Sequence, residues 1–169
     1  MSYTLYKHLQ FNAWANGKIV EILKNLDESL FDKEVNSSFP TIRKTIYHIW
    51  DAEQIWFKRI KGESVNTWPS EDLNEPFAET LNKFAKNSQE LADFISTKDR
   101  LFLEKQINYT NLKGLQFSNP VEDILFHVVN HGSFHRGQLI TMLRELGETK
   151  FPAQDLIAYL RQLQPTTLN

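Results

Sequence analysis

The stretch from Asn119 to Gly147 constrains the fold more than any other, because it carries the signals of one long helix. Asn119 is placed to cap this helix, Pro120 fits its first position, and Glu122 stands where a capping-box carboxylate would. Gly147 is placed to end the helix in a left-handed conformation. Apolar residues between these ends follow helical spacing and indicate a buried stripe: Ile124, Val128, Leu139, Met142 and Leu146.

Three histidines, His127, His131 and His135, recur at every fourth residue along this stripe. Neighbouring members lie about 6 Å apart along the helix axis, so two imidazoles can reach one metal ion. The outer pair lies about 12 Å apart, which argues against one ion taking all three. A lone histidine is more often a hydrogen-bonded core residue, but an adjacent pair on an apolar stripe favours a ligand role. The spacing leaves open which pair binds.

The composition excludes several other kinds of site. The chain has 169 residues, 41% of them hydrophobic, which is enough for one sizeable core. It contains no cysteine, so disulfides, iron–sulfur clusters, thiolate zinc sites and a cysteine nucleophile are excluded together. The net charge of −2 gives no electrostatic reason to expect a nucleic-acid or membrane partner. Because no segment has the length and apolarity of a signal core or a membrane span, we expect a cytoplasmic protein.

Apolar periodicity predicts one all-α domain over residues 1–169, a four-helix bundle. The segment between Asp99 and Ser118 reads as two extended stretches around a turn at Asn111–Gly114, which predicts a small hairpin before the last long helix. Residues 27–40 and 62–75 read as links. The predicted helices run from about Thr4 to Leu26, from Thr41 to Gly62, from Pro76 through Ile95, from Asn119 to Gly147, and, as a short terminal helix, from Asp155 to Leu163.

Four further polar residues lie on or beside the apolar faces of the first two helices. Asn12 and Asn16 share the apolar face of the first, either as core-edge amides bonded to a neighbouring helix or as residues lining a polar cavity. Glu53 falls within the apolar stripe of the second, where an unpaired carboxylate is costly. His48 lies at the margin of that stripe. Either residue fits a boundary position, or His48 supplies a third nitrogen and Glu53 orients a ligand or transfers a proton.

Three segments carry a family resemblance. FNAWANGKIVEIL, HIWDAEQIWFKRI and HVVNHGSFHRGQL resemble, in this order, the DinB family, a DinB/YfiT-like group named for a damage-inducible bacterial member. The most specific part is His-Gly-Ser-Phe-His-Arg-Gly-Gln. The resemblance covers nearly the whole chain, including the hairpin and the Asp-Leu-Ile-x-Tyr ending.

This resemblance implies an up-down-down-up four-helix bundle, often homodimeric, with a divalent ion held by one histidine of the second helix and two of the fourth. Carried over by motif, the ligands are His48, His131 and His135, and His127 becomes a neighbour of the site. Thiol transferases and a thiol-dependent isomerase share this scaffold, so the family implies a fold and a site but not one substrate.

Three neutral imidazoles would leave a divalent ion its full charge and an open coordination position. Water or a thiol bound there becomes a nucleophile at neutral pH. Zinc and nickel suit the nitrogen ligands best, although iron and manganese are also compatible. Since the chain has no cysteine, any thiol must come from a low-molecular-weight cosubstrate.

The remaining polar residues complete a predicted small-molecule site. Glu53 would orient a ligand or shuttle a proton, and Asn12 and Asn16 would bind substrate beside His127. Arg136 would neutralise an anionic group, unless it forms a salt bridge.

Three classes of function fit these features. We favour a metal-dependent enzyme of the thiol S-transferase or hydrolase type that acts on a small molecule. The alternatives are a metal-binding stress-response protein without catalysis and a helical interaction module with incidental histidines.

Overall fold

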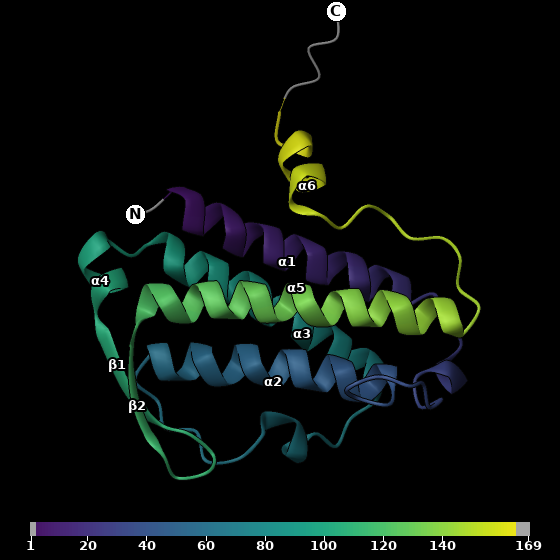
Figure 1. The fold of residues 1–169 in the computed structure, drawn as a ribbon, viewed down its shortest axis with the longest axis horizontal. Coiled ribbons are helices and arrows are strands. Elements are labelled where there is room, and N and C mark those ends of the chain that lie inside the picture. Colours follow the sequence, from purple (N-terminus) through teal and green to yellow (C-terminus); the bar gives the residue numbers. More distant parts are fainter. Residues whose placement is uncertain (1–2, 165–169) are drawn as a thin grey trace, which may run out of the picture.

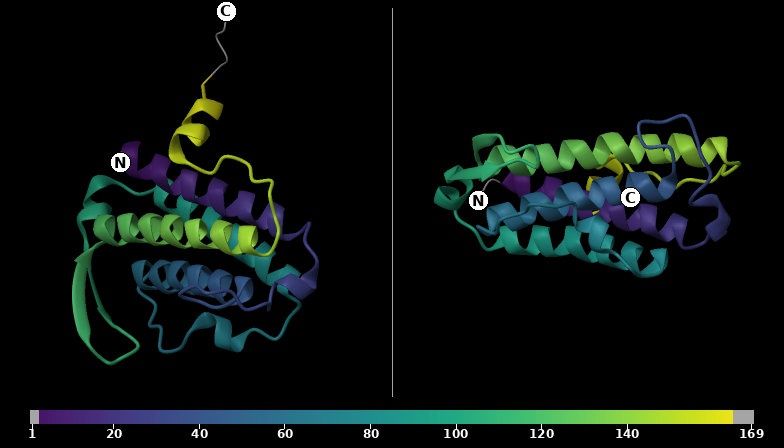
Figure 2. Two further views of the ribbon diagram at one scale, coloured as in Figure 1. Left: turned by 45° about the vertical axis from the view of Figure 1, so that its right-hand side comes forward. Right: turned by 90° about the horizontal axis from the view of Figure 1, so that it is seen from below.

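Four long helices lie along one another in the computed structural model, which describes residues 3–164 (Figure 1). They are α1 (Tyr3–Leu23), α2 (Ile42–Ile60), α3 (Phe77–Ser96) and α5 (Val121–Glu145). The first and last run in one direction and the middle two in the opposite one, as the sequence colours show (Figures 1 and 2). Contacts join α1 to α3 and α5, and α2 to α5 and α3. The chain is therefore the predicted up-down-down-up four-helix bundle.

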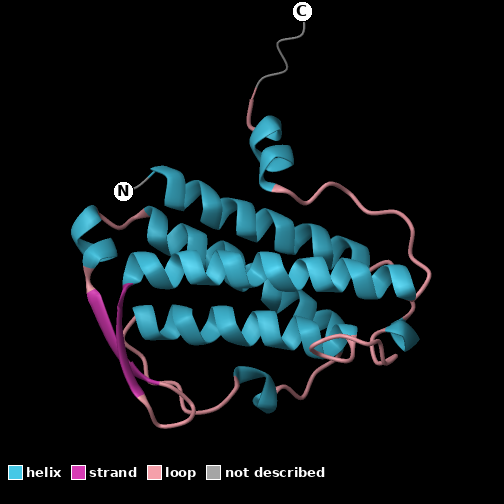
Figure 3. Cartoon of the chain, viewed as in Figure 1, coloured by secondary structure: helices cyan, strands magenta, loops and turns pink. Residues whose placement is uncertain are grey.

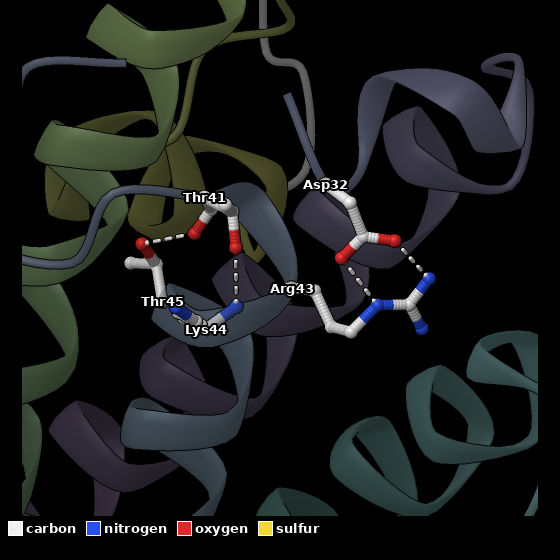
Figure 4. A network of polar contacts seen from close by, with 5 residues as sticks. All are labelled: Asp32, Thr41, Arg43, Lys44 and Thr45. Carbon is white, nitrogen blue, oxygen red and sulfur yellow. Dashed lines mark hydrogen bonds and ion pairs between the residues drawn. The ribbon is translucent and has the colours of Figure 1, made fainter. Parts of the chain in front are cut away.

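The start of α2 is fixed by a polar network (Figure 4). The Thr41 hydroxyl accepts from the Lys44 backbone N–H at 3.2 Å, and the Thr45 hydroxyl donates to the Thr41 carbonyl at 2.9 Å. Capping by Thr satisfies a backbone group that the first turn leaves without a helical partner. Arg43 donates two hydrogen bonds to Asp32, each 2.8 Å long, and so ties the preceding link to the helix. These contacts set the position of α2, which carries two of the predicted site residues.

The boundaries of α5 differ from the prediction at one end. The helix begins at Val121 with Pro120 as a cap that makes no side-chain hydrogen bond, so the predicted cap at Asn119 is wrong. Asn119 belongs instead to a strand, where its side chain accepts from the Tyr109 hydroxyl at 2.9 Å. At the other end the prediction is confirmed, since Gly147 has a φ of 101°.

The predicted hairpin is present between the third and fourth long helices (Figure 3). Strands β1 (Gln106–Thr110) and β2 (Gln116–Pro120) pair antiparallel with Tyr109 opposite Phe117. The segment before them is not extended as predicted but forms a short helix, α4 (Arg100–Glu104). The reason is a cap that the pattern of apolar residues did not reveal, because Asp99 accepts from the Phe102 backbone N–H at 2.9 Å.

Short elements also occur in the links and at the end of the described chain. The 3₁₀ helices η1 (Glu28–Leu30) and η2 (Pro69–Asp72) lie in the two predicted links. Helix α6 (Leu156–Gln162) packs on α1, with the Tyr159 ring 5.5 Å from that of Trp14. The predicted domain spans 1–169, of which residues 1–2 and 165–169 lie outside the described part. No helix within residues 3–164 is both long and apolar enough to span a membrane.

The apolar core has two parts, with a polar layer between them. One cluster lies toward the hairpin end and includes Leu5, Leu9, Leu91, Ile95 and Leu125. The other lies toward the opposite end and includes Ile19, Leu23, Ile46, Phe84 and Leu139. On each long helix, buried polar residues occupy the positions in between: Asn12 and Asn16, Glu53, Asn87 and Ser88, and Arg136. Because buried polar groups are costly unless they are paired, we expect the residues of this layer to bind one another.

Candidate metal centre

Three histidine side chains from two helices converge at one point of the bundle. His131 and His135 lie one turn apart on α5, and His48 reaches them from α2. One nitrogen from each ring lies within 4.8 Å of the other two. The three pairs of ring centroids are 4.5 to 4.7 Å apart. Residues that are 83 positions apart in the chain are thus brought to hydrogen-bond distance, with 2.9 Å between the Nε2 atoms of His131 and His48.

The protonation of this group fits a metal ion. Burial, together with the neighbouring histidines, lowers the pKa of His48 to about 4 and that of His131 to about 3. Burial also lowers the pKa of His135. All three rings are therefore neutral at pH 7, which is the form that binds metals. Neutral nitrogens this close together form a donor set suited to zinc or nickel.

A glutamine fixes the orientation of one of these rings. Nδ1 of His135 lies 2.7 Å from Oε1 of Gln138, and Nε2 of Gln138 donates to the Ser38 hydroxyl at 3.0 Å. Because the amide oxygen only accepts, Nδ1 of His135 carries the proton, and Nε2 is left with a free lone pair. Gln138 was not among the predicted site residues. Its position three residues after a ligand, on the same helix face, is the signal that could have found it.

Aromatic rings surround the histidines. Phe39 stacks on His48 with 4.1 Å between ring centroids and meets His135 edge-on at 5.7 Å. Phe134 lies edge-on to His135 at 5.0 Å. Phe39 comes from the link before α2, and no periodic pattern there pointed to a site. These apolar walls reduce the access of water to the nitrogens, which strengthens electrostatic interactions among them.

Glu53 lies at the centre of a separate, fully buried network. Its Oε1 accepts from the side-chain amides of Asn12 and Asn16 at 2.6 and 2.8 Å. Its Oε2 accepts from the Ser88 hydroxyl at 2.6 Å and from the Asn87 amide at 3.4 Å. Burial raises the pKa of Glu53, while the bonds from Ser88 and Asn12 oppose that rise. Four donors around one carboxylate satisfy a charge that would otherwise be costly to bury.

Arg136 completes this network from the opposite side. Its Nη1 donates to the amide oxygens of Asn12 and Asn16, both at 2.7 Å, and its Nη2 donates to the Ser133 hydroxyl at 2.9 Å. Burial lowers the pKa of Arg136 to about 10, while the charge of Glu53 acts in the other direction. The two asparagines therefore link a buried cation to a buried anion, each amide accepting from one and donating to the other.

Gly132, within the most specific part of the sequence motif, makes this arrangement possible. A Cβ at this position would lie 2.7 Å from Oδ1 of Asn12 and 2.8 Å from Nη1 of Arg136. Contacts that short do not occur, so any side chain here would displace the hydrogen bond between these two residues. Glycine allows α1 and α5 to approach closely beside His131.

The structure thus divides the predicted site residues into two groups. His48, His131 and His135 come together, and His127 lies beside them with its ring 5.6 Å from that of His131. The other predicted residues form the buried network instead: Asn12, Asn16, Glu53 and Arg136. Among the described residues, no hydrogen bond joins that network to the histidine rings. Glu53 is not positioned to exchange a proton with a ligand directly, and the two asparagines face the network rather than a cavity.

The lowered histidine pKa values predict that the metal-free protein loses stability in mild acid. In the unfolded chain these rings ionise near pH 6.5, whereas in the folded chain they stay neutral down to about pH 4 for His48 and about 3 for His131. Between these limits the unfolded state binds more protons, so the free energy of unfolding decreases as the pH falls from about 6.5 towards 3. Denaturant titrations of chelator-treated protein would measure this. The double variant His48→Gln/His131→Gln should show a shallower dependence, and an unchanged slope would contradict the assignment.

Comparisons with known proteins agree with this fold. The sequence profile of the DinB family matches residues 1–166. Protein DinB of Bacillus subtilis (strain 168) is 32% identical over 161 residues, covering 90% of this chain and 91% of its own length. Uncharacterized protein YizA of the same organism is 30% identical over 108 residues, or 60% and 62% of the two chains.

Two solved structures from Bacillus subtilis are also similar. YfiT, described as a probable metal-dependent hydrolase with an unusual four-helix bundle topology, superposes with a TM-score of 0.70 at 13% identity, over 88% of this chain and 91% of its own. The DinB-like protein YjoA superposes with a TM-score of 0.64 at 16% identity, over 88% and 97%. At these identities the likeness concerns the fold.

Proposed function

The chain belongs to the DinB family, and on this premise we propose that it is a metal-dependent enzyme of the hydrolase or thiol S-transferase type. Its substrate would be a small molecule, and its working form a homodimer. One observation carries the proposal, namely that nitrogens of His48, His131 and His135 lie within 4.8 Å of one another. The description of the structural neighbour YfiT as a probable metal-dependent hydrolase supports the same reaction class.

The three histidines would hold a divalent ion, zinc or nickel, through one nitrogen each. A bound ion of this kind lowers the pKa of a coordinated water or thiol and so supplies a nucleophile at neutral pH. The chain's own residues prepare this chemistry. Gln138 keeps the proton on Nδ1 of His135, which leaves the lone pair of Nε2 available to a metal ion.

His127 is the group best placed to take up a proton. It lies on the exposed side of His131, and burial of part of its ring lowers its pKa, so the ring is neutral at pH 7. A neutral imidazole beside a reacting group can act as a general base. Glu53 serves a different purpose in this proposal, because its four hydrogen bonds hold α1, α2 and α3 together.

A hollow of about 580 Å³ has the volume of a small-molecule site; none of the three histidines lines it, but two neighbours of His135 do. Its walls include Phe134 and Gln138, both of which contact His135. Ser38, the hydrogen-bond partner of Gln138, lines it as well. In this proposal a substrate would bind in this hollow against Phe134 and Gln138, next to His135.

A paired activity panel tests this proposal. Protein purified without a chelator or histidine tag is loaded with zinc or nickel, and its metal content is measured before assay. It is then given ester and amide substrates with water as the nucleophile, and small electrophiles with low-molecular-weight thiols. We expect turnover in one arm, lost on removal of the metal and in His131→Ala. Hydrolysis alone would assign a hydrolase, and thiol consumption alone a transferase. A fully loaded protein without turnover in either arm would contradict the enzymatic proposal.

A further inference from the structure

A second hollow, of about 680 Å³, lies between the hairpin and the C-terminal end of α2. Arg59 of α2 lines it, together with Asn66 from the following loop and residues of both strands, among them Asn108, Tyr109, Phe117 and Ser118. Its volume is in the range of small-molecule sites. None of the three candidate metal ligands lines it.

Arg59 is the unusual feature of this hollow. Its side chain is only 8% exposed, and its guanidinium lies over the rings of Trp56 and Tyr109, 4.9 and 4.7 Å from their centroids. Nη2 donates to the Thr110 carbonyl at 3.0 Å. Burial lowers the pKa of Arg59, while Tyr109 acts in the opposite direction.

No described carboxylate pairs with this cation. Glu63, the acidic residue among those lining the hollow, is bound by Lys61 at 2.8 Å. A guanidinium has five N–H donors in a planar fork, and the Thr110 carbonyl takes one of them. Buried charges are usually paired with an opposite charge, because an unpaired one is costly. Arg59 therefore has donors and charge to offer a ligand.

We propose that this hollow binds a small organic anion whose carboxylate pairs with Arg59. A carboxylate matches the guanidinium fork with two parallel hydrogen bonds. Tyr109 and Phe117 form an apolar wall for the rest of the molecule, their rings stacked with 5.8 Å between centroids. Since Phe117 is partly exposed, a flat apolar body can lie against it. The ligand is thus an aromatic or similarly flat carboxylate.

This site is distinct from the candidate metal centre. Trp56 lies between the two, with its ring 4.9 Å from that of Tyr109 and 5.7 Å from that of His127. The competing explanation is that Arg59 only braces the hairpin against α2 through Thr110. If Arg59 has only this structural role, the hollow should have no affinity for anions, so a binding measurement distinguishes the two explanations.

Titration of the metal-free protein with benzoate and benzamide tests the proposal. The two compounds share a ring and differ in charge. Amide chemical shifts of residues 106–118 report on the hollow. We expect benzoate to bind at least about tenfold more tightly than benzamide, as a charge-assisted hydrogen-bond pair would give. Equal affinities, or no benzoate-induced shift in the hairpin, would overturn the proposal.

Two variants locate the effect. Arg59→Gln should weaken benzoate binding by at least about tenfold, and Arg59→Lys should keep a preference for benzoate over benzamide at lower affinity. The matched control is Arg144→Gln, since Arg144 also lies over an aromatic ring, that of Phe151 at 5.2 Å, but lines a different hollow. Undiminished benzoate binding in a folded Arg59→Gln protein, or an equal loss of binding in Arg144→Gln, would overturn the proposal that the carboxylate pairs with Arg59. If Arg59→Gln does not fold, the comparison of the two compounds on the wild type decides.

Discussion

Replacing Glu53 with alanine should destabilise the protein by about 3–5 kcal/mol, as expected when one partner of a buried charge pair is removed. The substitution would remove the acceptor of Asn12 and one of the acceptors of Asn16 and Ser88 in the middle of the bundle. It would also leave the Arg136 guanidinium, which is only 4% exposed, without its counter-charge. The free energy of unfolding from denaturant titration measures the loss.

Two further variants separate this effect from that of lost volume. Glu53→Gln keeps the shape but turns an NH₂ group toward donors, so it should cost less than alanine, about 1–3 kcal/mol. Glu90→Ala removes an exposed carboxylate paired with Lys86 and should change the stability by about 0.5 kcal/mol or less. A loss below about 1 kcal/mol for Glu53→Ala would mean that the network does not stabilise the bundle as described.

Replacing His131 with alanine should lower the affinity for zinc or nickel by more than about a hundredfold, because changing even the outer partners of metal ligands costs ten- to a hundredfold. His131 lies close to both other rings of the cluster, with centroid distances of 4.7 Å to His48 and 4.5 Å to His135. Calorimetric titration of tag-free protein gives the affinity. Stabilisation by added metal, seen as a rise in Tm, should disappear in parallel, because a ligand stabilises the state to which it binds.

Two other histidines serve as controls. His8 lies on α1 and contacts the Thr4 carbonyl at 2.8 Å, outside the cluster, so His8→Ala should bind metal like the wild type. His127→Ala tests the choice between adjacent pairs on α5 and should reduce the affinity much less than His131→Ala. If His127→Ala proved the more damaging of the two, the ligand set would be His127 and His131 instead.

The helices and the hairpin could be predicted from the sequence because they depend on local patterns. Apolar spacing defined the long helices, and glycine at Gly147 marked a helix end. Predictions failed where two local signals competed. Asn119 is a residue type that often caps helices, but here it belongs to the hairpin. Its backbone pairs with Ile107, and its side chain accepts a hydrogen bond from the Tyr109 hydroxyl. The leucines before β1 alternate as in a strand, yet Asp99 caps a helical turn.

The site was harder to predict from the sequence than the fold, because its contacts join residues far apart in the chain. Helical spacing brought His131 and His135 together but left His127 as an alternative, and only the family motif linked them to His48. Asn12, Glu53 and Arg136 stood out as polar residues on apolar faces. Spacing did not reveal that they bind one another, since the hydrogen bond between Asn12 and Arg136 spans 124 positions. Nothing periodic marked Phe39, which stacks on His48 from a link.

The network around Glu53 and the histidine cluster have complementary roles. The network around Glu53 draws on all four long helices and holds them at fixed distances. The histidines then come from α2 and α5 only, beside that fixed layer. A metal site gains from such support, because ligands held in place before the ion arrives lose little freedom when they bind it.

X-ray absorption spectroscopy of the zinc- or nickel-loaded, tag-free protein counts the imidazoles on the ion and so tests whether the three histidines bind one cation. We expect one ion per chain with three imidazole nitrogens at about 2.0–2.1 Å and at least one oxygen ligand from solvent. His48→Ala should reduce that number by one. A spectrum with one imidazole or none, or an ion bound in full when His48 and His131 are both replaced, would contradict the convergence of these rings on a single cation.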